Sequence, residues 1–310
     1  MQPVAVIDIG SNSVCLLVVA RLRDGTLSPV AKHKHVARLR DALDGEGKLT
    51  ADGLQRFLAA LHEFARVLEN WQVGRVRAVA TAALRAAGNG DELVELAERE
   101  TGIHVEIISG AEEARLAYLG VRHGLGAAAS GSILCADVGG GSSELLVGDA
   151  GAVLDSVSTA LGALVVARTL LGPDPVGFAQ VDSARAALKT AFAEPTAVVG
   201  RHRIDLAVAT SGTIQRVARI AQGLGGRTVD DVHRTVLTLP QLQMVIDALA
   251  TAENQESRLK IPAMDPSRAD NLLGGALIFE AVAELLGLKA WTVSMDGLRM
   301  GVVSELAGVW

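Results

Sequence analysis

The chain has 310 residues, which is enough for two domains of ordinary size. Hydrophobic residues make up 49% of it and aromatic residues only 3%, so its cores must be built from Ala, Val, Leu and Ile. The formal net charge of −6 argues against a general polyanion binder such as a nucleic-acid-binding protein, because those proteins usually carry a basic surface. We therefore expect any phosphate-rich ligand to be held by a local group of basic residues.

The first predicted elements are two strands joined by a polar turn. Residues 4–9 and 14–20 are apolar and residues 10–13 are polar, which is typical of strand, turn and strand. No basic segment precedes this region, and its apolar runs are far shorter than the roughly 20 residues of a membrane span. Both cysteines, Cys15 and Cys135, lie in apolar runs, as buried reduced thiols do. These features favour a cytoplasmic protein with neither a signal peptide nor a membrane partner.

An amphipathic helix is predicted next, over residues 54–71, because apolar residues recur there at steps of three and four and Thr50 is a suitable N-cap. The pattern then predicts a strand at 76–80, a helix at 91–101, a strand at 104–108 and a helix at 111–123. The segment 124–131 is rich in Gly, Ala and Ser. It is the predicted boundary between an N-terminal domain, residues 1–125, and a C-terminal domain, residues 126–310.

The C-terminal half repeats the opening pattern of the chain. Residues 133–138 and 145–147 are apolar and flank a glycine turn, so a second unit of strand, turn and strand is predicted. Helices and strands follow at 163–171, 183–192, 206–209, 214–221, 239–251, 269–286 and 291–294. A final helix after Gly297 is expected to pack back on the N-terminal domain. The alternation of helices and strands predicts an α/β protein with two domains and mixed sheets.

Both glycine turns have the composition of phosphate-binding loops. Glycine lets backbone N–H groups approach a phosphate closely, and Ser or Asn adds side-chain donors. A single turn of this kind is more often an ordinary hairpin, but two copies, each after an aspartate that could hold magnesium through water, favour phosphate binding. The candidate residues are Asp8, Gly10, Ser11, Asn12 and Ser13 in the first turn, and Asp137, Gly139, Gly140, Gly141, Ser142 and Ser143 in the second.

Further residues could contribute to binding a phosphate chain. Ser211, Gly212 and Thr213 follow a predicted strand and begin a helix, so they form either a third anion site or a plain N-cap. Basic residues cluster in several places, and each cluster could equally be a solvated surface. The clusters are Lys32, His33, Lys34, His35, Arg38 and Arg40; Arg75, Arg77 and Arg85; and Arg201, His202 and Arg203.

Six short motifs stand in a fixed order along the chain. They are DIGSNS (8–13), ATAALR (80–85), EIISGAEEARL (106–116), DVGGGSSE (137–144), SGT (211–213) and DGLR (296–299). In this order they resemble the exopolyphosphatase and guanosine pentaphosphate phosphohydrolase family. The resemblance runs from end to end and is to the short, two-domain form. It implies two ribonuclease-H-like domains of the actin-like ATPase superfamily, with the active site in the cleft between them.

The resemblance also assigns roles to single residues. It makes Glu113 the catalytic base that would deprotonate the attacking water, although a carboxylate in the first turn of a helix could simply stabilise the helix dipole. It places Arg85 on the phosphate chain, where a guanidinium group can bind two oxygens at once. It makes Asp137 and Glu144, with Asp8 as a third, the candidates for holding Mg²⁺ or Mn²⁺.

Two positions depart from the family pattern. Cys15 stands where a histidine is frequent, and Ala42 stands where glycine is usual. Both changes affect the shape of the expected cleft rather than its proposed chemistry. The family resemblance and the apolar stretch 272–286 also predict a homodimer, although burial of that stretch within its own domain is the simpler alternative.

The function that these features predict is hydrolysis of the terminal phosphate of inorganic polyphosphate. A second possibility within the resembled family is conversion of guanosine pentaphosphate to the tetraphosphate. A third is an ATP-using kinase, which the 3% aromatic content disfavours because few rings are available to stack adenine. A fourth is a non-catalytic phosphate sensor, which would have no use for a base at Glu113.

Overall fold

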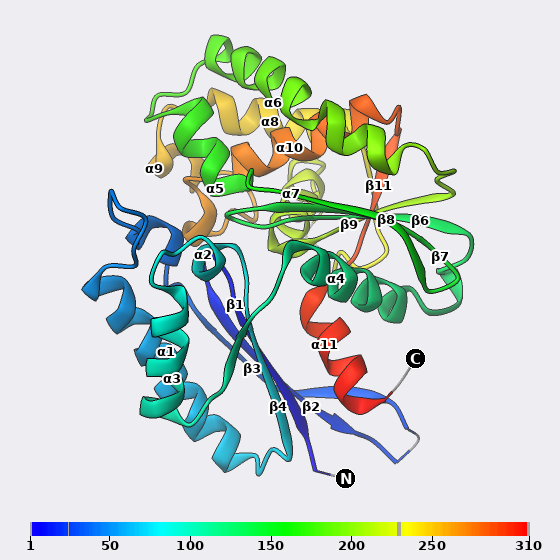
Figure 1. Ribbon diagram of the computed structural model, residues 1–310. Coiled ribbons are helices and arrows are strands. Elements are labelled where there is room, and N and C mark those ends of the chain that lie inside the picture. Colours follow the sequence, from blue (N-terminus) through cyan, green and yellow to red (C-terminus); the bar gives the residue numbers. More distant parts are fainter. Residues whose placement is uncertain (1, 24, 228–230, 309–310) are drawn as a thin grey trace.

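The computed structural model describes residues 2–23, 25–227 and 231–308, and these residues form two mixed β-sheets (Figure 1). The N-terminal sheet has the strand order β3-β2-β1-β4-β5, and the C-terminal sheet has the order β10-β11-β9-β6-β7-β8. The strands are β1 (Val4–Ile9), β2 (Val14–Arg21), β3 (Leu27–His35), β4 (Arg75–Ala80), β5 (Val105–Ile107), β6 (Ser132–Val138), β7 (Ser143–Asp149), β8 (Ala152–Thr159), β9 (Leu206–Thr210), β10 (Val236–Thr238) and β11 (Ala290–Val293).

The two sheets share one arrangement. Around β1, the strands β2 and β3 follow in antiparallel pairing on one side, and β4 and β5 in parallel pairing on the other. Around β6, the strands β7 and β8 are antiparallel on one side, and β9 and β11 are parallel on the other. The predicted repeat of strand, turn and strand is therefore part of a repeated sheet, to which β10 adds an edge strand. The predicted α/β class with mixed sheets is confirmed.

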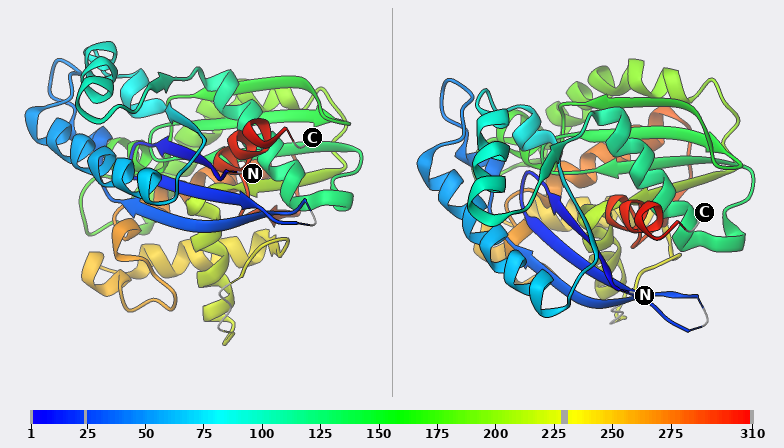
Figure 2. Two further views of the ribbon diagram at one scale, coloured as in Figure 1. Left: turned by 90° about the horizontal axis from the view of Figure 1, so that it is seen from below. Right: turned by 60° about the horizontal axis from the view of Figure 1, so that its bottom comes forward.

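Helices cover the sheets and also separate them. The main ones are α1 (Ala51–Asn70), α2 (Ala82–Arg85), α3 (Gly90–Thr101), α4 (Gly110–Leu125), α5 (Ala163–Val166), α6 (Phe178–Val199), α7 (Ser211–Leu224), α8 (Leu239–Thr251), α9 (Gln255–Arg258), α10 (Leu272–Leu285) and α11 (Leu298–Ala307). Helices α1 and α3 lie on the outer side of the N-terminal sheet, and α6, α8 and α10 on the outer side of the C-terminal sheet (Figure 1). Between the sheets lie α4, which contacts β6, β7 and β8, and α11, which contacts β1 (Figures 1 and 2).

Helix α1 illustrates why most elements could be predicted from the sequence pattern. Phe57, Leu61 and Phe64 recur at helical spacing and are fully buried against the N-terminal sheet. The predicted N-cap is confirmed, because Thr50 Oγ1 accepts a hydrogen bond from the backbone N–H of Gly53 at 3.3 Å. One periodic face and one cap were enough to define this element.

Three strands were missed by the sequence analysis: β10, which has only three residues, and the longer strands β3 and β8. Each is an edge strand of its sheet, and most of its side chains are exposed or only partly buried. Edge strands therefore carry polar residues and lack the apolar run by which the inner strands were recognised. Strand β3 also contains Pro29, a residue that disfavours a strand prediction. It lies at an irregularity in the pairing with β2, where proline is tolerated.

The apolar helix α10 is buried within the chain. Every residue from Leu272 to Ala283 is buried, and the helix contacts α5, α6, α7 and α8. Its apolar surface is thus used inside the C-terminal half, and it offers no support for the predicted homodimer. Among the helices of the described residues, none is long and apolar enough to cross a lipid bilayer.

Helices α4 and α11 cross at close range through glycine. A Cβ atom on Gly120 of α4 would overlap the carbonyl oxygen of Gly297, just before α11. A Cβ atom on Gly301 of α11 would overlap the carbonyl oxygen of Leu116 in α4. Only glycine allows this backbone contact. The crossing fixes the end of the chain against the helix that carries the predicted base.

We predict that Gly120→Ala lowers the free energy of unfolding by about 1–3 kcal/mol, because the added methyl group would force the two helices apart. In an exposed helix the same replacement would stabilise the protein, so the sign of the change is informative. Urea unfolding measures it. The control is Gly45→Ala, since nothing lies within 4 Å of the Cβ position there. Equal unfolding curves for the two variants would contradict a tight crossing.

Candidate active site

The two glycine-rich turns lie against each other at the ends of β1 and β6. We call residues 10–13 the first phosphate loop and residues 139–143 the second, after the ligand that the sequence predicts for them. In each loop the first glycine donates a backbone hydrogen bond of 3.0 Å to the carbonyl of the residue three positions further on. A Cβ atom on Gly141 would overlap the hydroxyl of Ser11, and one on Gly140 would lie 3.2 Å from the Ser11 Cβ. Glycine is therefore needed for the two loops to meet.

The first phosphate loop carries buried polar atoms without partners. Among the described residues, no hydrogen-bond partner is found for Ser11 Oγ, for either amide atom of Asn12, or for Ser13 Oγ. Leaving a buried polar group unpaired is costly, so such groups usually have a ligand or water as a partner. Unpaired hydroxyl and amide groups of this kind suit the oxygens of a phosphate group.

A row of three side chains crosses the N-terminal sheet beside this loop. Asp8 on β1 pairs in register with Cys15 on β2, and Cys15 pairs with Lys34 on β3. Residues in direct register on neighbouring strands point to the same face of the sheet. The Lys34 ammonium lies 3.5 Å from Ser267 Oγ, so this face is turned toward the C-terminal half of the chain.

The C-terminal sheet carries the equivalent row. Asp137 on β6 pairs in register with Glu144 on β7, and Glu144 pairs with Ser158 on β8. The Ser158 hydroxyl donates a hydrogen bond of 2.9 Å to Glu144 Oε1, and Glu144 is only 1% exposed. The repeated sheets thus place an acidic row from the second half near the Asp8 row from the first.

Glu113 lies in the first turn of α4, where Ser109 caps the helix by accepting a backbone hydrogen bond at 3.1 Å. Arg85, at the end of α2, donates to Glu113 Oε2 and to the carbonyl oxygen of Ile108, each at 2.9 Å. Glu113 is 7% exposed. Burial raises the pKa of its carboxyl group to about 7, although the hydrogen bond from Arg85 acts in the opposite direction. A carboxylate with this pKa can accept a proton from water at neutral pH.

The segment 211–213 begins α7 beside the second phosphate loop. Thr213 Oγ1 donates a hydrogen bond of 3.0 Å to the carbonyl of Val138, the residue that precedes this loop. Ser211 has a φ of 98°, a left-handed conformation that is rare for residues other than glycine and is often found at functional sites. Arg268 Nη1 donates to Thr213 Oγ1 at 3.2 Å, which brings a cation to the same place.

Arg268 and Arg299 lie at the site, although the sequence analysis gave neither a role. Arg299 Nε is 3.9 Å from Asp8 Oδ2, and Arg268 lies close enough to Cys15 to affect the pKa of its thiol. Neither arginine belongs to a run of basic residues, so charge clustering gave no signal. Arg299 ends the DGLR motif, and this is the only sequence feature that could have identified it.

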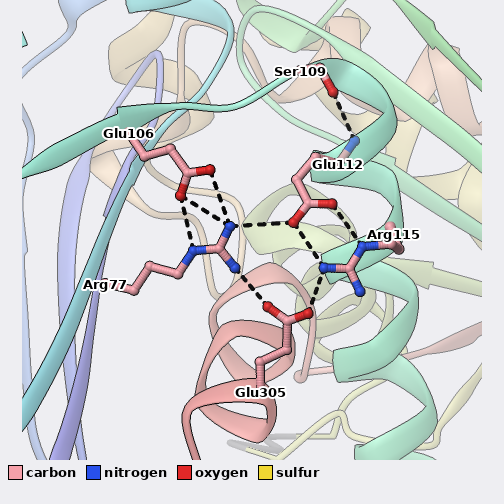
Figure 3. A network of polar contacts seen from close by, with 6 residues as sticks. All are labelled: Arg77, Glu106, Ser109, Glu112, Arg115 and Glu305. Carbon is pink, nitrogen blue, oxygen red and sulfur yellow. Dashed lines mark hydrogen bonds and ion pairs between the residues drawn. The ribbon is translucent and has the colours of Figure 1, made fainter.

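The basic clusters singled out in the sequence lie in different places. Lys34 is in the row beside the first phosphate loop, and Arg38 forms an ion pair of 2.6 Å with Asp270 of the C-terminal half. Arg77 belongs instead to a network with three glutamates around the start of α4 (Figure 3). His202 and Arg203 each contact an aspartate of the C-terminal half at 2.6 Å. Only part of the predicted basic surface therefore faces the loops.

Comparison with known proteins identifies the family. The sequence pattern of the Ppx/GppA phosphatase family matches residues 18–308. The chain belongs to this family. It is 34% identical to Exopolyphosphatase 1 of Mycobacterium tuberculosis over 299 residues. This matched region covers 96% of this chain and 86% of that protein. The corresponding values for Exopolyphosphatase 1 of Mycobacterium leprae are 32%, 96% and 87%.

Solved structures of Ppx/GppA proteins agree with this assignment. A family member from Aquifex aeolicus is 30% identical and superposes with a TM-score of 0.84, covering 99% of this chain and 98% of that one. An exopolyphosphatase from Cytophaga hutchinsonii is 26% identical, with a TM-score of 0.88 and coverage of 100% and 99%. The resemblance inferred from the six motifs is therefore confirmed, and the two-sheet fold is that of Ppx/GppA proteins.

The acidic residues of this Ppx/GppA chain have the chemistry of a magnesium site. Burial, and then the nearby charges of Glu113 and Asp8, raise the pKa of Asp137 to about 7. Burial, followed by the charges of Glu113 and Asp137, also raises the pKa of Glu144. Within the described ranges, no three Asp, Glu, His or Cys side chains are arranged to hold an ion by themselves. Mg²⁺ fits such a site, because it commonly takes one or two carboxylates and completes its shell with water and phosphate oxygens.

These pKa shifts make the stability of the fold change with pH in a definite direction. In the unfolded chain, Glu113 and Asp137 would titrate near their ordinary values of 4.5 and 3.8, whereas in the folded protein both titrate at about 7. Between about pH 4 and pH 7 the folded state therefore binds more protons than the unfolded state. The resulting stabilisation is complete below that range and is lost as the pH rises through about 7.

We therefore predict that Mg²⁺ raises the thermal unfolding temperature more at pH 8 than at pH 5, because a bound cation offsets the repulsion between ionised carboxylates. Thermal unfolding in EDTA and in magnesium chloride measures this difference. Asp137→Asn and Glu144→Gln should each reduce it, and should raise the magnesium concentration needed for half-maximal activity. A magnesium effect that is equal at both pH values and unchanged in both variants would show that these carboxylates do not hold the ion.

Proposed function

We propose that this protein hydrolyses the terminal phosphate of inorganic polyphosphate and releases orthophosphate. The observation that carries the proposal is Glu113, a buried carboxylate with a pKa of about 7 that is bound to Arg85 beside two phosphate loops. Two relatives at 34% and 32% identity are named exopolyphosphatases, which supports polyphosphate over guanosine pentaphosphate as the substrate. A non-catalytic sensor would not need a buried base.

In this proposal the two phosphate loops bind the end of the polyphosphate chain. Ser11, Asn12 and Ser13 donate to its oxygens, which supplies the partners that their buried polar atoms lack. The N-terminus of α7, with Ser211 at its first position, adds backbone donors for a neighbouring phosphate. Holding the terminal phosphate in one orientation allows a water molecule to attack in line.

Glu113 acts as the base in the chemical step. It takes a proton from the water molecule as the water oxygen bonds to the terminal phosphorus and the bond to the bridging oxygen breaks. The products are orthophosphate and a polyphosphate one unit shorter, which carries the former bridging oxygen. Arg85, bound to Glu113, neutralises charge on the transferred phosphoryl group. Magnesium held by Asp137 and Glu144, with Asp8 nearby, would neutralise further charge on the phosphate oxygens.

We predict that Glu113→Gln lowers turnover by roughly 10²–10⁴-fold while the fold is retained, because a positioned base is lost. Orthophosphate release from polyphosphate, guanosine pentaphosphate and ATP, each with and without magnesium, tests both the base and the substrate. The control is Glu92→Gln, which changes an exposed carboxylate in the first turn of another helix, α3. Unchanged turnover of Glu113→Gln would remove this residue from the mechanism. Faster hydrolysis of guanosine pentaphosphate than of polyphosphate would favour the second substrate.

Long polyphosphate should also contact basic residues beyond the reacting end. Lys34 lies two strands from Asp8, roughly 10 Å away, so it could meet a phosphate further along the chain. We predict that Lys34→Ala raises KM mainly for long polyphosphate and makes this KM less dependent on salt, because one phosphate contact is lost. Arg85→Lys should instead lower turnover equally for all chain lengths, since a lysine cannot bind two phosphate oxygens at once as a guanidinium group can.

The measurement compares both variants on pyrophosphate and on long polyphosphate at two salt concentrations. Wild-type KM should rise more steeply with salt for the long chain than for pyrophosphate, which spans fewer contacts. If Lys34→Ala and Arg85→Lys reduced activity on both substrates by equal factors, with the wild-type salt dependence, an extended binding track would have to be abandoned.

A further inference from the structure

Glu112 and Glu113 are adjacent in α4 but have different surroundings. Glu113 is buried and bound to Arg85. Glu112 instead lies in an ion network with Arg77 and Arg115 (Figure 3). Successive residues of an α-helix point about 100° apart around its axis. A rotation of α4 therefore moves both carboxylates together, and any contact that fixes the direction of Glu112 also fixes that of Glu113.

Two arginines hold the side chain of Glu112. Arg115, one turn further along α4, donates to both of its carboxylate oxygens, at 2.7 and 2.8 Å. Arg77 on β4 donates to it over a longer distance, 3.3 Å. These hydrogen bonds lower the pKa of Glu112, with the bond from Arg115 as the main cause. The pair of Glu112 and Arg115 is strong, but it lies within one helix and cannot by itself fix α4 relative to the sheet.

Glu305 on α11 connects this pair to the rest of the protein. One of its carboxylate oxygens accepts a hydrogen bond from Arg77 at 2.6 Å, and the other accepts one from Arg115 at 2.5 Å (Figure 3). It thereby links β4, α4 and α11, three elements that are distant in the sequence. Glu106 also binds Arg77, at 3.0 Å, but it has no contact with α4 in the network.

The network is partly exposed, which limits its contribution to folding. The side chains of Arg77 and Glu305 are 23% exposed, that of Glu112 27% and that of Arg115 35%, so water and salt screen their attraction. Its geometry nevertheless restricts the start of α4. The network does not include Arg85, which would be shared between Glu113 and the phosphate during the reaction.

We propose that Glu305 is a positioning residue for hydrolysis: through Arg77 and Arg115 it holds Glu112, and so sets the rotation of α4 that directs Glu113 at the attacking water. This inference rests on the proposed function, in which Glu113 takes the proton from that water. Glu305 itself touches neither the phosphate loops nor the carboxylates around them. Its effect on the reaction is indirect and requires a base at position 113.

Glu305→Gln is the variant that tests this role. The amide keeps the size of the side chain but removes the charge, and its NH₂ group would face arginine donors where an acceptor is required. Turnover on long polyphosphate with magnesium should fall about 10- to 100-fold, as expected for a misplaced base, while KM and the unfolding temperature stay near wild-type values. Arg77→Lys should behave in the same way, because an ammonium group cannot bind three glutamates in a fixed geometry. The matched control, Glu106→Gln, removes a partner of Arg77 without touching α4 and should leave turnover unchanged.

A double-mutant cycle with Glu113→Gln separates positioning from other effects. If Glu305 acts through Glu113, adding Glu305→Gln to Glu113→Gln should cause no further loss of turnover. The same fold-loss in both backgrounds, a rise in KM alone, or wild-type turnover of Glu305→Gln and Arg77→Lys would each overturn the positioning role and leave the proposed function intact. Full activity of Glu113→Gln would instead overturn the proposed function, and this inference with it.

Discussion

The burial of several carboxylates close to one another is the constraint on which the site depends. Glu113, Asp137 and Glu144 come from different elements; besides burial, the charge of Glu113 makes ionisation of Asp137 and Glu144 less favourable, and that of Asp137 does the same to Glu144. Burial, with a smaller contribution from the charge of Asp8, brings the pKa of Glu113 to about 7, the range in which a carboxylate can serve as a base at neutral pH. It also makes a divalent cation with phosphate ligands the natural counterpart of the site. The buried carboxylates disfavour folding when they are ionised, and the same groups suit the site to the proposed phosphate chemistry.

The two helices between the sheets, α4 and α11, fix the position of one of these carboxylates. Helix α4 carries Glu113, and α11 crosses it so closely that Gly120 and Gly301 cannot bear a side chain. The repeated sheets bring the two phosphate loops together, whereas this unrepeated layer of helices sets the position of Glu113, the proposed base. The site therefore requires both a duplicated sheet, which supplies matching loops, and a single pair of helices, which breaks the symmetry.

Most of the framework could be predicted from local pattern, because an inner strand or an amphipathic helix is encoded in consecutive residues. Helix α1 was predicted from its periodic apolar face and its cap, and the hairpin β1–β2 from two apolar runs around a glycine turn. The edge strands β3 and β8 were not predicted, since their exposed positions carry polar residues and leave no apolar signature. This omission concealed the place of Lys34 and Ser158 in the two rows of side chains at the site.

By itself the sequence determined the α/β class, the two loops and, through the order of its motifs, the family. These properties depend on residue types at short, fixed spacings, which can be recognised without any knowledge of distant contacts. Tertiary structure decided the rest: the contact of Gly141 with Ser11, the presence of Arg268, and the link from Arg77 to Glu305 across 228 positions of sequence. Such contacts and the pKa of Glu113 depend on which distant groups approach one another and exclude water, and no local spacing encodes that distance.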